Sequence, residues 1–418
     1  MSERNIKQKI LNDPVYGFID MPVGVNLEIV EHPWFQRLRH IRQLGLSFLV
    51  YPGAIHTRFQ HTIGAYFLVN QAVVEIRSKG LEISKDEEEA VGAAILLHDI
   101  GHGPFSHALE FSLLEGISHE VISQAIMHSL NRQFGGRLNL AIKIFQNKYR
   151  RGFLHQLISS QLDMDRLDYL KRDSFFSGVS EGIIGTERII KMLDVRNDKL
   201  VVEAKGIYSI EKFLIARRLM YWQVYLHKTV LVAEQMLIQI IRRARELILS
   251  GKKIFVTPAL GYFMAHRLSA EQFTTGKAVL GKKTAIDLFN EIDDNDILTC
   301  VKVWQSSDDK VLSLLCTMLM NRRLLKIEMQ RNPFRKKTVE TRRSEWARKM
   351  KMSADEAAYF VFTETATNNA YNPDDERINI LHKNGSLQDI AEASDMLNLK
   401  VLSKNVVKYF FCYPKESH

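Results

Sequence analysis

The sequence predicts a mainly α-helical fold with a small α/β lobe at the C-terminal end. Up to about residue 320, apolar residues recur at helical spacing between helix start and stop signals. After residue 320, short runs rich in β-branched and aromatic residues are typical of strands. We therefore expect a helical core over residues 1–320 and a basic α/β lobe over residues 321–418, with a regulatory or oligomerisation role for the lobe.

The elements of the first 136 residues follow from local signals. A turn at Asn12–Pro14 precedes an alternating segment, Val15–Met21, that predicts a strand or hairpin arm. Pro33 is expected to start a helix that Gly45 ends. The Ser84–Glu87 capping box starts a helix that ends in His98-Asp99. Further helices are expected after His56 to about Lys79, at Pro104–Leu114, and from Ser118 to the Gly135-Gly136 pair.

The later elements are predicted from longer patterns. Two amphipathic helices are expected at Asn139–Arg150 and Gly152–Arg172, and a proline-free helical pattern runs from Gly206 to Gly251. Shorter helices fill Thr257–Met320, and a basic helix is expected at Thr338–Met352. The strands expected in the C-terminal lobe are Leu324–Met329, Tyr359–Thr363, Ile378–His382 and Val407–Cys412.

Composition limits the class of protein. A chain of 418 residues suggests two to three domains, and no apolar run reaches the length of a transmembrane helix. The N-terminus carries no apolar signal region. The three cysteines, Cys300, Cys316 and Cys412, match neither a disulfide framework nor a zinc site. We expect a cytoplasmic protein without a membrane partner.

The positive charge is concentrated in one block. The net charge is +9, and residues 322–351 contain twelve Lys/Arg and three Glu, so the rest of the chain sums to zero. Such a block usually forms a solvated surface. Otherwise it binds a polyanion, either a nucleoside triphosphate or nucleic acid.

The stretch Leu97–His107 carries the strongest chemical signal. It contains His98, Asp99, His102 and His107 around two glycines, after an apolar helical run. The glycines let the backbone approach an ion or a phosphate closely, and His98 and His102 are spaced to share a helix face. Because buried polar groups need partners, this cluster indicates a metal or proton-transfer site rather than a satisfied core histidine.

A stripe of polar side chains is expected on one helix face over residues 165–172. Asp165, Asp168, Tyr169 and Arg172 fall at i, i+3, i+4 and i+7, directly after an apolar stretch. A solvated helix face explains this arrangement poorly. His61, three residues after Arg58, is a candidate for a further metal ligand from a neighbouring helix.

A second stripe lies inside the long helical pattern. Arg217, Tyr221, Tyr225 and Lys228 repeat at intervals of four, four and three residues. This spacing is equally typical of an aromatic core seam and of a ligand-binding wall, and the sequence does not choose between them.

Taken in order, these motifs resemble those of a known family. They are Asn12-Asp-Pro14, Phe35-Gln-Arg-Leu-Arg39, Gln43-Leu-Gly45, Tyr51-Pro-Gly-Ala54, Arg58-Phe-Gln-His61, His98–His107, Asp163–Asp173 and Tyr225-Leu-His-Lys228. The chain resembles the HD-domain phosphohydrolases and, more narrowly, the deoxynucleoside triphosphate triphosphohydrolases of bacteria and vertebrates. The resemblance covers about residues 7–250. It implies an HD-domain helical core that hydrolyses a deoxynucleoside triphosphate (dNTP) to a deoxynucleoside and inorganic triphosphate.

The resemblance implies a metal and a set of catalytic residues. A divalent metal (Mg, Mn, Fe or Zn) is implied at His61, His98, Asp99 and Asp165, and this type of donor set does not choose among the four metals. The implied catalytic residues are His102, His107, His119 and Glu110. The three histidines would line the phosphate site, with His119 as a proton donor close to the leaving group. Glu110 stands where the family has an aspartate.

The resemblance also implies a substrate-binding set: Gln43, Leu44, Arg58, Arg166, Tyr169, Asp173, Arg217 and Tyr225. The three arginines would grip phosphate oxygens through their fork-shaped guanidinium groups. Arg166 stands where the vertebrate enzyme has lysine. Gln43, Asp173 and Tyr225 would bind the sugar, and Leu44 and Tyr225 would crowd a 2′-hydroxyl.

A regulatory nucleotide site is implied by seven further residues: Lys9, Asn12, Glu31, Gln36, Arg39, His227 and Lys228. Glu31 replaces an aspartate of the family pattern. Such sites lie between subunits in the family, so the resemblance implies a homo-oligomer, a dimer or tetramer, that a nucleotide activates.

Two other functions stay open at the level of sequence. The HD metal core would equally serve a phosphohydrolase for nucleoside monophosphates, cyclic dinucleotides or a guanosine alarmone, although three arginines favour a triphosphate. A nucleic-acid-binding protein would use the block 322–351, where only Phe334 and Trp346 are available for base stacking.

Overall fold

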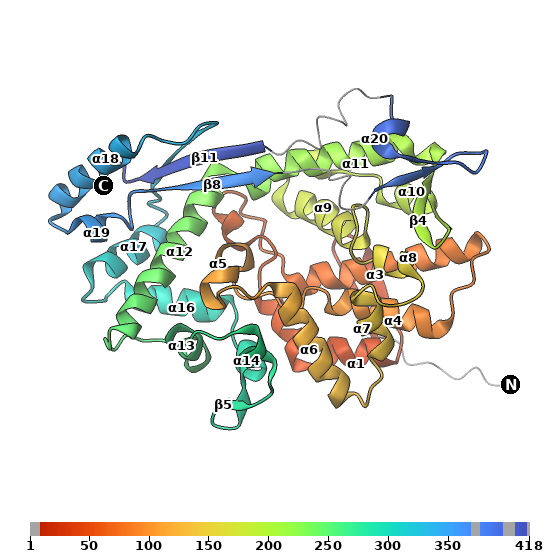
Figure 1. Cartoon of the computed structure of the whole chain (residues 1–418), viewed down its shortest axis with the longest axis horizontal. Coiled ribbons are helices and arrows are strands. Elements are labelled where there is room, and N and C mark those ends of the chain that lie inside the picture. The colour runs from red at the N-terminus through yellow and green to blue at the C-terminus, as the bar shows by residue number, and fades with distance from the viewer. Residues whose placement is uncertain (1–8, 369–376, 396–405, 416–418) are drawn as a thin grey trace.

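The computed structural model describes residues 9–368, 377–395 and 406–415, apart from the side chains of residues 106, 107, 111, 112 and 368. Within this part of the chain the fold is mainly helical with small sheets, several of them in the C-terminal part (Figure 1). The predicted fold class is therefore confirmed.

The larger of two buried apolar clusters forms around helix α3 (Arg58–Ser78), which packs against α4 (Lys85–Leu97) and α9 (Met164–Ser177). Both α3 and α4 begin at capping boxes, so their first backbone N–H groups are satisfied. Further helices that contribute to this cluster include α1 (Val25–Glu31), α2 (Pro33–Gln36), α6 (His119–Gln133), α7 (Asn139–Phe145), α8 (Gly152–Gln156), α10 (Thr186–Lys191), α11 (Ile207–Met220), α14 (Ala270–Thr274) and α15 (Ala285–Phe289).

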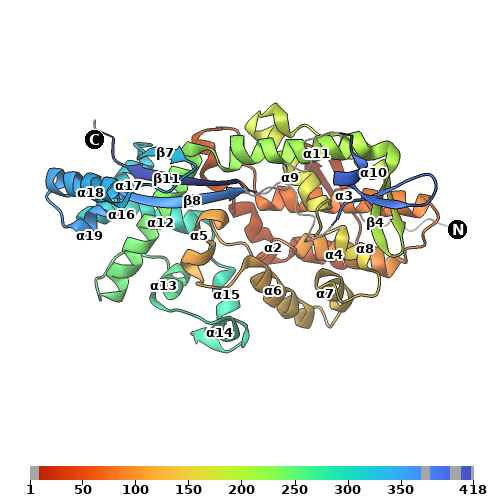
Figure 2. The same cartoon turned by 45° about the horizontal axis from the view of Figure 1, so that its top comes forward.

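The second cluster forms around α12 (Lys228–Leu249), α16 (Asp294–Trp304) and α17 (Lys310–Met320). Beside them, β7 (Lys326–Gln330), β11 (Val406–Tyr413) and β8 (Phe362–Asn368) form an antiparallel sheet in the order β7-β11-β8. Figures 1 and 2 show this sheet at one end of the molecule. The other helices here are α5 (Ser106–Leu113), α13 (Pro258–Ala265), α18 (Lys336–Met350) and α19 (Ala354–Ala357).

A C-terminal segment returns to the first cluster. There, β3 (Leu193–Arg196) and β4 (Lys199–Glu203) form a hairpin, and β9 (Asn379–Leu381) pairs parallel to β4. β10 (Leu387–Asp389) completes the sheet, and α20 (Ile390–Ala393) follows it. Because segments from before and after residue 320 contribute to both clusters, the expected boundary does not separate the two cores, and the two-domain division stays a prediction.

Two small hairpins complete the described fold. β1 (Lys9–Asp13) pairs with β2 (Gly17–Met21), which contains most of the predicted strand Val15–Met21. β5 (Ala278–Leu280) pairs with β6 (Lys283–Thr284), and neither strand was expected from the sequence.

Two shorter helix predictions are wrong. The helix expected at Pro33–Leu44 ends early, because residues 37–40 form a 3₁₀ turn and Ile41 is extended. The helix expected at Gly152–Arg172 is divided, because the Asp163 carboxylate accepts hydrogen bonds from the backbone N–H groups of Ser160 and Arg166 and so starts α9.

The predicted long helix Gly206–Gly251 is also divided. A π-helical turn at Tyr221–Tyr225 follows α11, and His227 then caps α12. No single described helix is long and apolar enough to span a membrane, and α11 with α12 meets that test only as a pair bent by 56°.

Candidate metal and phosphate site

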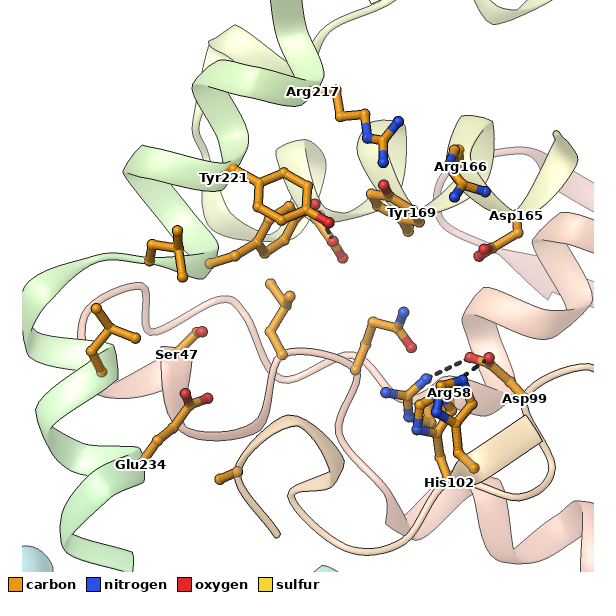
Figure 3. Close-up of a pocket in the computed structure, with 18 of the residues that line it drawn as sticks. Ser47, Arg58, Asp99, His102, Asp165, Arg166, Tyr169, Arg217, Tyr221 and Glu234 are labelled. Carbon is orange, nitrogen blue, oxygen red and sulfur yellow. Dashed lines mark hydrogen bonds and ion pairs between the residues drawn. The ribbon is translucent and has the colours of Figure 1, made fainter. Parts of the chain in front are cut away.

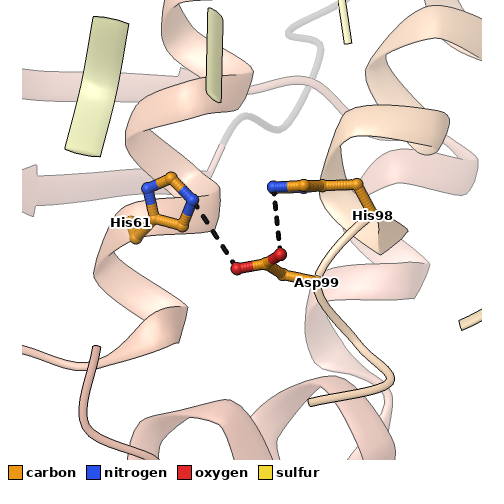
Figure 4. Close-up of side chains that lie close together, drawn as sticks. All are labelled: His61, His98 and Asp99. Atoms are coloured by element: carbon orange, nitrogen blue, oxygen red, sulfur yellow. Dashed lines mark ion pairs between the residues drawn. The ribbon is translucent and has the colours of Figure 1, made fainter. Parts of the chain in front are cut away.

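The four predicted metal ligands come together from three elements. His61 lies on α3, His98 and Asp99 lie in the turn that ends α4, and Asp165 lies in the first turn of α9. Figure 4 shows His61, His98 and Asp99 converging. The helix ends at Leu97, so His98 and His102 do not share a helix face as predicted, and the turn itself brings them to the site.

The spacing of these side chains suits one ion. His61 Nε2 lies 3.1 Å from Asp165 Oδ1 and 3.7 Å from Asp99 Oδ2, and His98 Nε2 lies 3.3 Å from Asp99 Oδ1. Ligand atoms bound to one metal at about 2.1 Å lie about 3–3.5 Å apart in tetrahedral or octahedral geometry. The distances are therefore close to those of a loaded site.

The hydrogen bonds of the two histidines direct their free nitrogens at this space. His61 Nδ1 bonds Asp168 Oδ2 at 2.7 Å, and His98 Nδ1 bonds the Ile95 carbonyl oxygen at 2.6 Å. Both Nε2 atoms are buried and have no hydrogen-bond partner among the described residues. A divalent cation satisfies both nitrogens and the two carboxylates, so the residues fit the metal that the sequence predicted.

A buried network of charged side chains holds Asp168, the hydrogen-bond partner of His61 Nδ1. Arg172 Nε donates to Asp168 Oδ2 at 2.9 Å, and Arg172 Nη1 donates to Asp13 Oδ2 at 2.7 Å. Asp168 and Arg172 have no exposed surface. The N-terminal hairpin, through Asp13, thus helps to hold the carboxylate that orients a metal ligand.

His119 lies beside this centre and lines the same cavity as Asp99 and His102. Its Nδ1 bonds Glu110 Oε1 at 2.6 Å, and its ring stacks on that of His102 with 3.9 Å between the centroids. Burial disfavours the imidazolium, but Glu110 raises the pKa of His119 above its ordinary value. The hydrogen bond from His119 in turn lowers the pKa of Glu110 to about 2. Burial and the charge of Arg58 lower the pKa of His102, which favours its neutral form.

A cavity of about 490 Å³ opens onto the site (Figure 3). All eight predicted substrate-binding residues line it: Gln43, Leu44, Arg58, Arg166, Tyr169, Asp173, Arg217 and Tyr225. Asp99, His102, His119 and Asp165 line it too. The side chain of His107 lies outside the described part of the structure, so its role stays a prediction.

Comparison with known proteins gives the family. The model of the HD domain matches residues 58–173, and that of the HD-associated region matches residues 184–256. The crystal structure of a phosphohydrolase from Bacteroides thetaiotaomicron is 50% identical, with a TM-score of 0.93 over 98% of this chain and 100% of that one. The chain belongs to the HD-domain phosphohydrolases.

Two further relatives of this HD-domain phosphohydrolase differ in how much of the chain they match. The uncharacterised protein YwfO of Bacillus subtilis is 28% identical over 98% of this chain and 93% of its own length. The SAMHD1 homolog of Dictyostelium discoideum, named a deoxynucleoside triphosphate triphosphohydrolase, is 31% identical over 53% of this chain and 46% of its own length. The family and the His/Asp cluster together make this protein a metal-dependent phosphohydrolase.

Gln43, Asp173 and Tyr225 give the cavity polar groups that can hydrogen-bond a hydroxyl-bearing ligand. Tyr225 Oη donates to Asp173 Oδ2 at 2.7 Å, and the other Asp173 oxygen bonds His56 Nε2 at 2.7 Å. Gln43 Oε1 is buried and has no hydrogen-bond partner among the described residues. A hydroxyl donor from a ligand would satisfy it.

The seven residues of the predicted regulatory site do not form one site within the described part of a single chain. Lys9 forms an ion pair with Glu31 at 2.9 Å, and Arg39 Nε donates to Gln36 Oε1 at 2.7 Å. Asn12 and Arg39 line a surface hollow of about 320 Å³. His227 instead caps α12 and contacts the Tyr51 ring, and Lys228 is its neighbour on that helix. The regulatory role stays a prediction.

The structure adds residues that the sequence did not single out for the site. Asp168 was visible in the polar stripe, but its bond to His61 was not. Ser47, Tyr221 and Glu234 line the cavity. Tyr221 belonged to the second stripe, whereas nothing in the local sequence marks Ser47 or Glu234.

Proposed function

We propose that this protein hydrolyses 2′-deoxynucleoside 5′-triphosphates to the deoxynucleoside and inorganic triphosphate. The observation that carries the proposal is the combination, around one cavity, of a metal site with Arg58, Arg166 and Arg217. Three guanidinium groups suit a triphosphate better than a monophosphate. The activity named for the Dictyostelium relative supports the same substrate class.

In the proposed reaction, different residues of the cavity have different roles. His61, His98, Asp99 and Asp165 would hold a metal, which when bound polarises a phosphate oxygen and lowers the pKa of a bound water. The three arginines neutralise the triphosphate. As water attacks the α-phosphorus, the bond to O5′ breaks, and protonated His119 gives its proton to O5′. The oxygen of the water leaves in the triphosphate, and the proton that the water loses balances, through the solvent, the one that His119 has given up.

The sugar-binding part of the cavity supports the deoxy preference. Leu44 and Tyr225 both line it, and the Tyr225 hydroxyl is held by Asp173. An apolar side chain and a fixed ring leave little room for a 2′-hydroxyl and offer it few hydrogen bonds.

The basic block 322–351 offers no comparable support for nucleic-acid binding. Trp346 is buried, and the Phe334 ring packs on Phe411 with 5.4 Å between the centroids. The two aromatic residues expected for base stacking are therefore occupied in the second core.

The test is to incubate the purified protein with each dNTP, each ribonucleotide, nucleoside monophosphates, a cyclic dinucleotide and a guanosine alarmone, in the presence of Mg²⁺, Mn²⁺, Fe²⁺ or Zn²⁺. Phosphorus NMR identifies the product. Inorganic triphosphate formed from dNTPs supports the proposal. Hydrolysis of only one of the other nucleotides refutes it. Arg217→Gln should slow dNTP turnover far more than Arg218→Gln, its matched control, because Arg218 is outside the cavity lining.

A further inference from the structure

The two ends of the cavity differ in chemistry. Figure 3 shows Asp99, Asp165 and Arg58 at one end and Ser47 with Glu234 at the other. A triphosphate belongs at the first end, where the metal ligands and the arginines lie. The sugar-binding residues Tyr225 and Asp173 also line this cavity. A base attached to the sugar then points to the second end.

Glu234 is an unusual residue for that position. It lies on α12 with Leu231 and Ile238, one turn before and after it, also lining the cavity. Its Oε1 lies 3.6 Å from the point that a Cβ would occupy at Gly45, so the carboxyl group faces the turn that carries Ser47. Within the described residues, no Lys, Arg or His forms an ion pair with it. Burial raises its pKa to about 8.

The fold gives no reason for this carboxyl group. A partly buried carboxylate without a cation loses part of its hydration, and an apolar residue at this place on α12 would pack with Leu231 and Ile238. A carboxyl group that faces a ligand cavity and has no partner among the described residues is explained by a ligand that donates hydrogen bonds to it.

We propose that Glu234 binds the Watson–Crick edge of the nucleobase and makes guanine the preferred base; this rests on the proposed dNTP hydrolysis. Guanine presents two adjacent donors, N1–H and the 2-amino group, which match the two oxygens of a carboxylate. Adenine and cytosine present one donor beside an acceptor, and thymine one donor between two acceptors. Two donors also favour the ionised carboxylate once guanine is bound.

The experiment compares kcat/KM for dGTP, dITP, dATP and dTTP. dITP is dGTP without the 2-amino group, so it removes one of the two hydrogen bonds. The wild type should prefer dGTP to dITP by about tenfold or more, the value of one charge-assisted hydrogen bond. Glu234→Gln should lower the ratio of dGTP to dTTP by at least about tenfold. Glu246→Gln makes the same change on the same helix, at a residue that bonds Tyr359 in the second core, and should leave the ratio unchanged.

Each possible result supports or overturns the proposed role of Glu234. Equal kcat/KM for dGTP and dITP in the wild type overturns the role of Glu234 without any variant, even where Glu234→Gln fails to fold. An unchanged ratio in a folded Glu234→Gln does the same while leaving dNTP hydrolysis intact. Absence of turnover with every dNTP overturns the proposed function and this inference together.

Discussion

Gly64→Ala tests whether the buried Asp168–Arg172 pair holds the metal ligand His61. Gly64 lies on α3, one turn after His61, and an added Cβ would lie 2.0 Å from Asp168 Oδ1 and 2.1 Å from Arg172 Nη2. Neither atom is the loose end of an exposed side chain, because both residues are fully buried. The pair must therefore move, and its hydrogen bonds with His61 and Asp13 must change with it.

The expected cost combines overpacking with a disturbed buried ion pair. Overpacking costs about 1–3 kcal/mol, and breaking a buried pair about 3–5 kcal/mol. Since the pair is displaced rather than deleted, we expect a loss of about 4 kcal/mol. The entropy of unfolding, scaled to 418 residues, is about 0.9 kcal/mol per K, so Tm should fall by about 4–5 °C. Reorientation of His61 should also weaken Mn²⁺ binding by about 10- to 100-fold.

The assay is thermal unfolding followed by circular dichroism, together with calorimetric titration of Mn²⁺. Gly103→Ala is the control, because it lies in the same metal-site motif but its Cβ would meet only the Phe289 ring, at 3.8 Å. That variant should keep both Tm and Mn²⁺ affinity. If Gly64→Ala also keeps both, the network does not position His61, and the reasoning is refuted.

Three further predictions concern the site itself. Asp165→Ala should remove the metal while the helical circular dichroism spectrum persists; full occupancy by mass spectrometry would exclude Asp165 as a ligand. Glu110→Gln removes the charge that raises the pKa of His119, so the high-pH limb of the kcat profile should move to lower pH, since His119 must be protonated to act; an unmoved limb would show that His119 is not the acid. Tyr225→Ala should raise turnover of GTP relative to dGTP by about tenfold or more; wild-type enzyme that hydrolyses both equally would show that there is no such selection.

Most of the residues that line the candidate site could be named from the sequence, because their short motifs resemble those of a known family. The Ser84–Glu87 capping box sets the start of α4 and so where its end presents His98 and Asp99. By contrast, the π-helical turn at Tyr221–Tyr225 contains no glycine or proline. It depends on distant contacts, such as the Tyr51 hydroxyl bonding the Gln223 carbonyl oxygen. The local sequence pattern therefore predicted one long helix over Gly206–Gly251.

Two other features were not predicted, for different reasons. The β3–β4 hairpin had a local signal in the adjacent Asn197 and Asp198, because these residue types tolerate the positive φ that a tight hairpin turn requires and that both adopt here. Glu234 had none, since helical periodicity places it on a face of α12 but cannot show that this face meets the turn at Ser47. Which helix face meets a cavity depends on tertiary packing.

The pairing of β9 with β4 has a consequence for biosynthesis. Until residues 379–381 have left the ribosome, the backbone N–H and C=O groups on one side of β4 have no strand beside them. An open strand edge is a template for pairing with other chains, and contacts this distant in sequence form slowly. The core that carries the metal site is therefore complete only after nearly the whole chain has been translated. A nascent or truncated chain that ends near residue 320 would leave one edge of β4 unprotected.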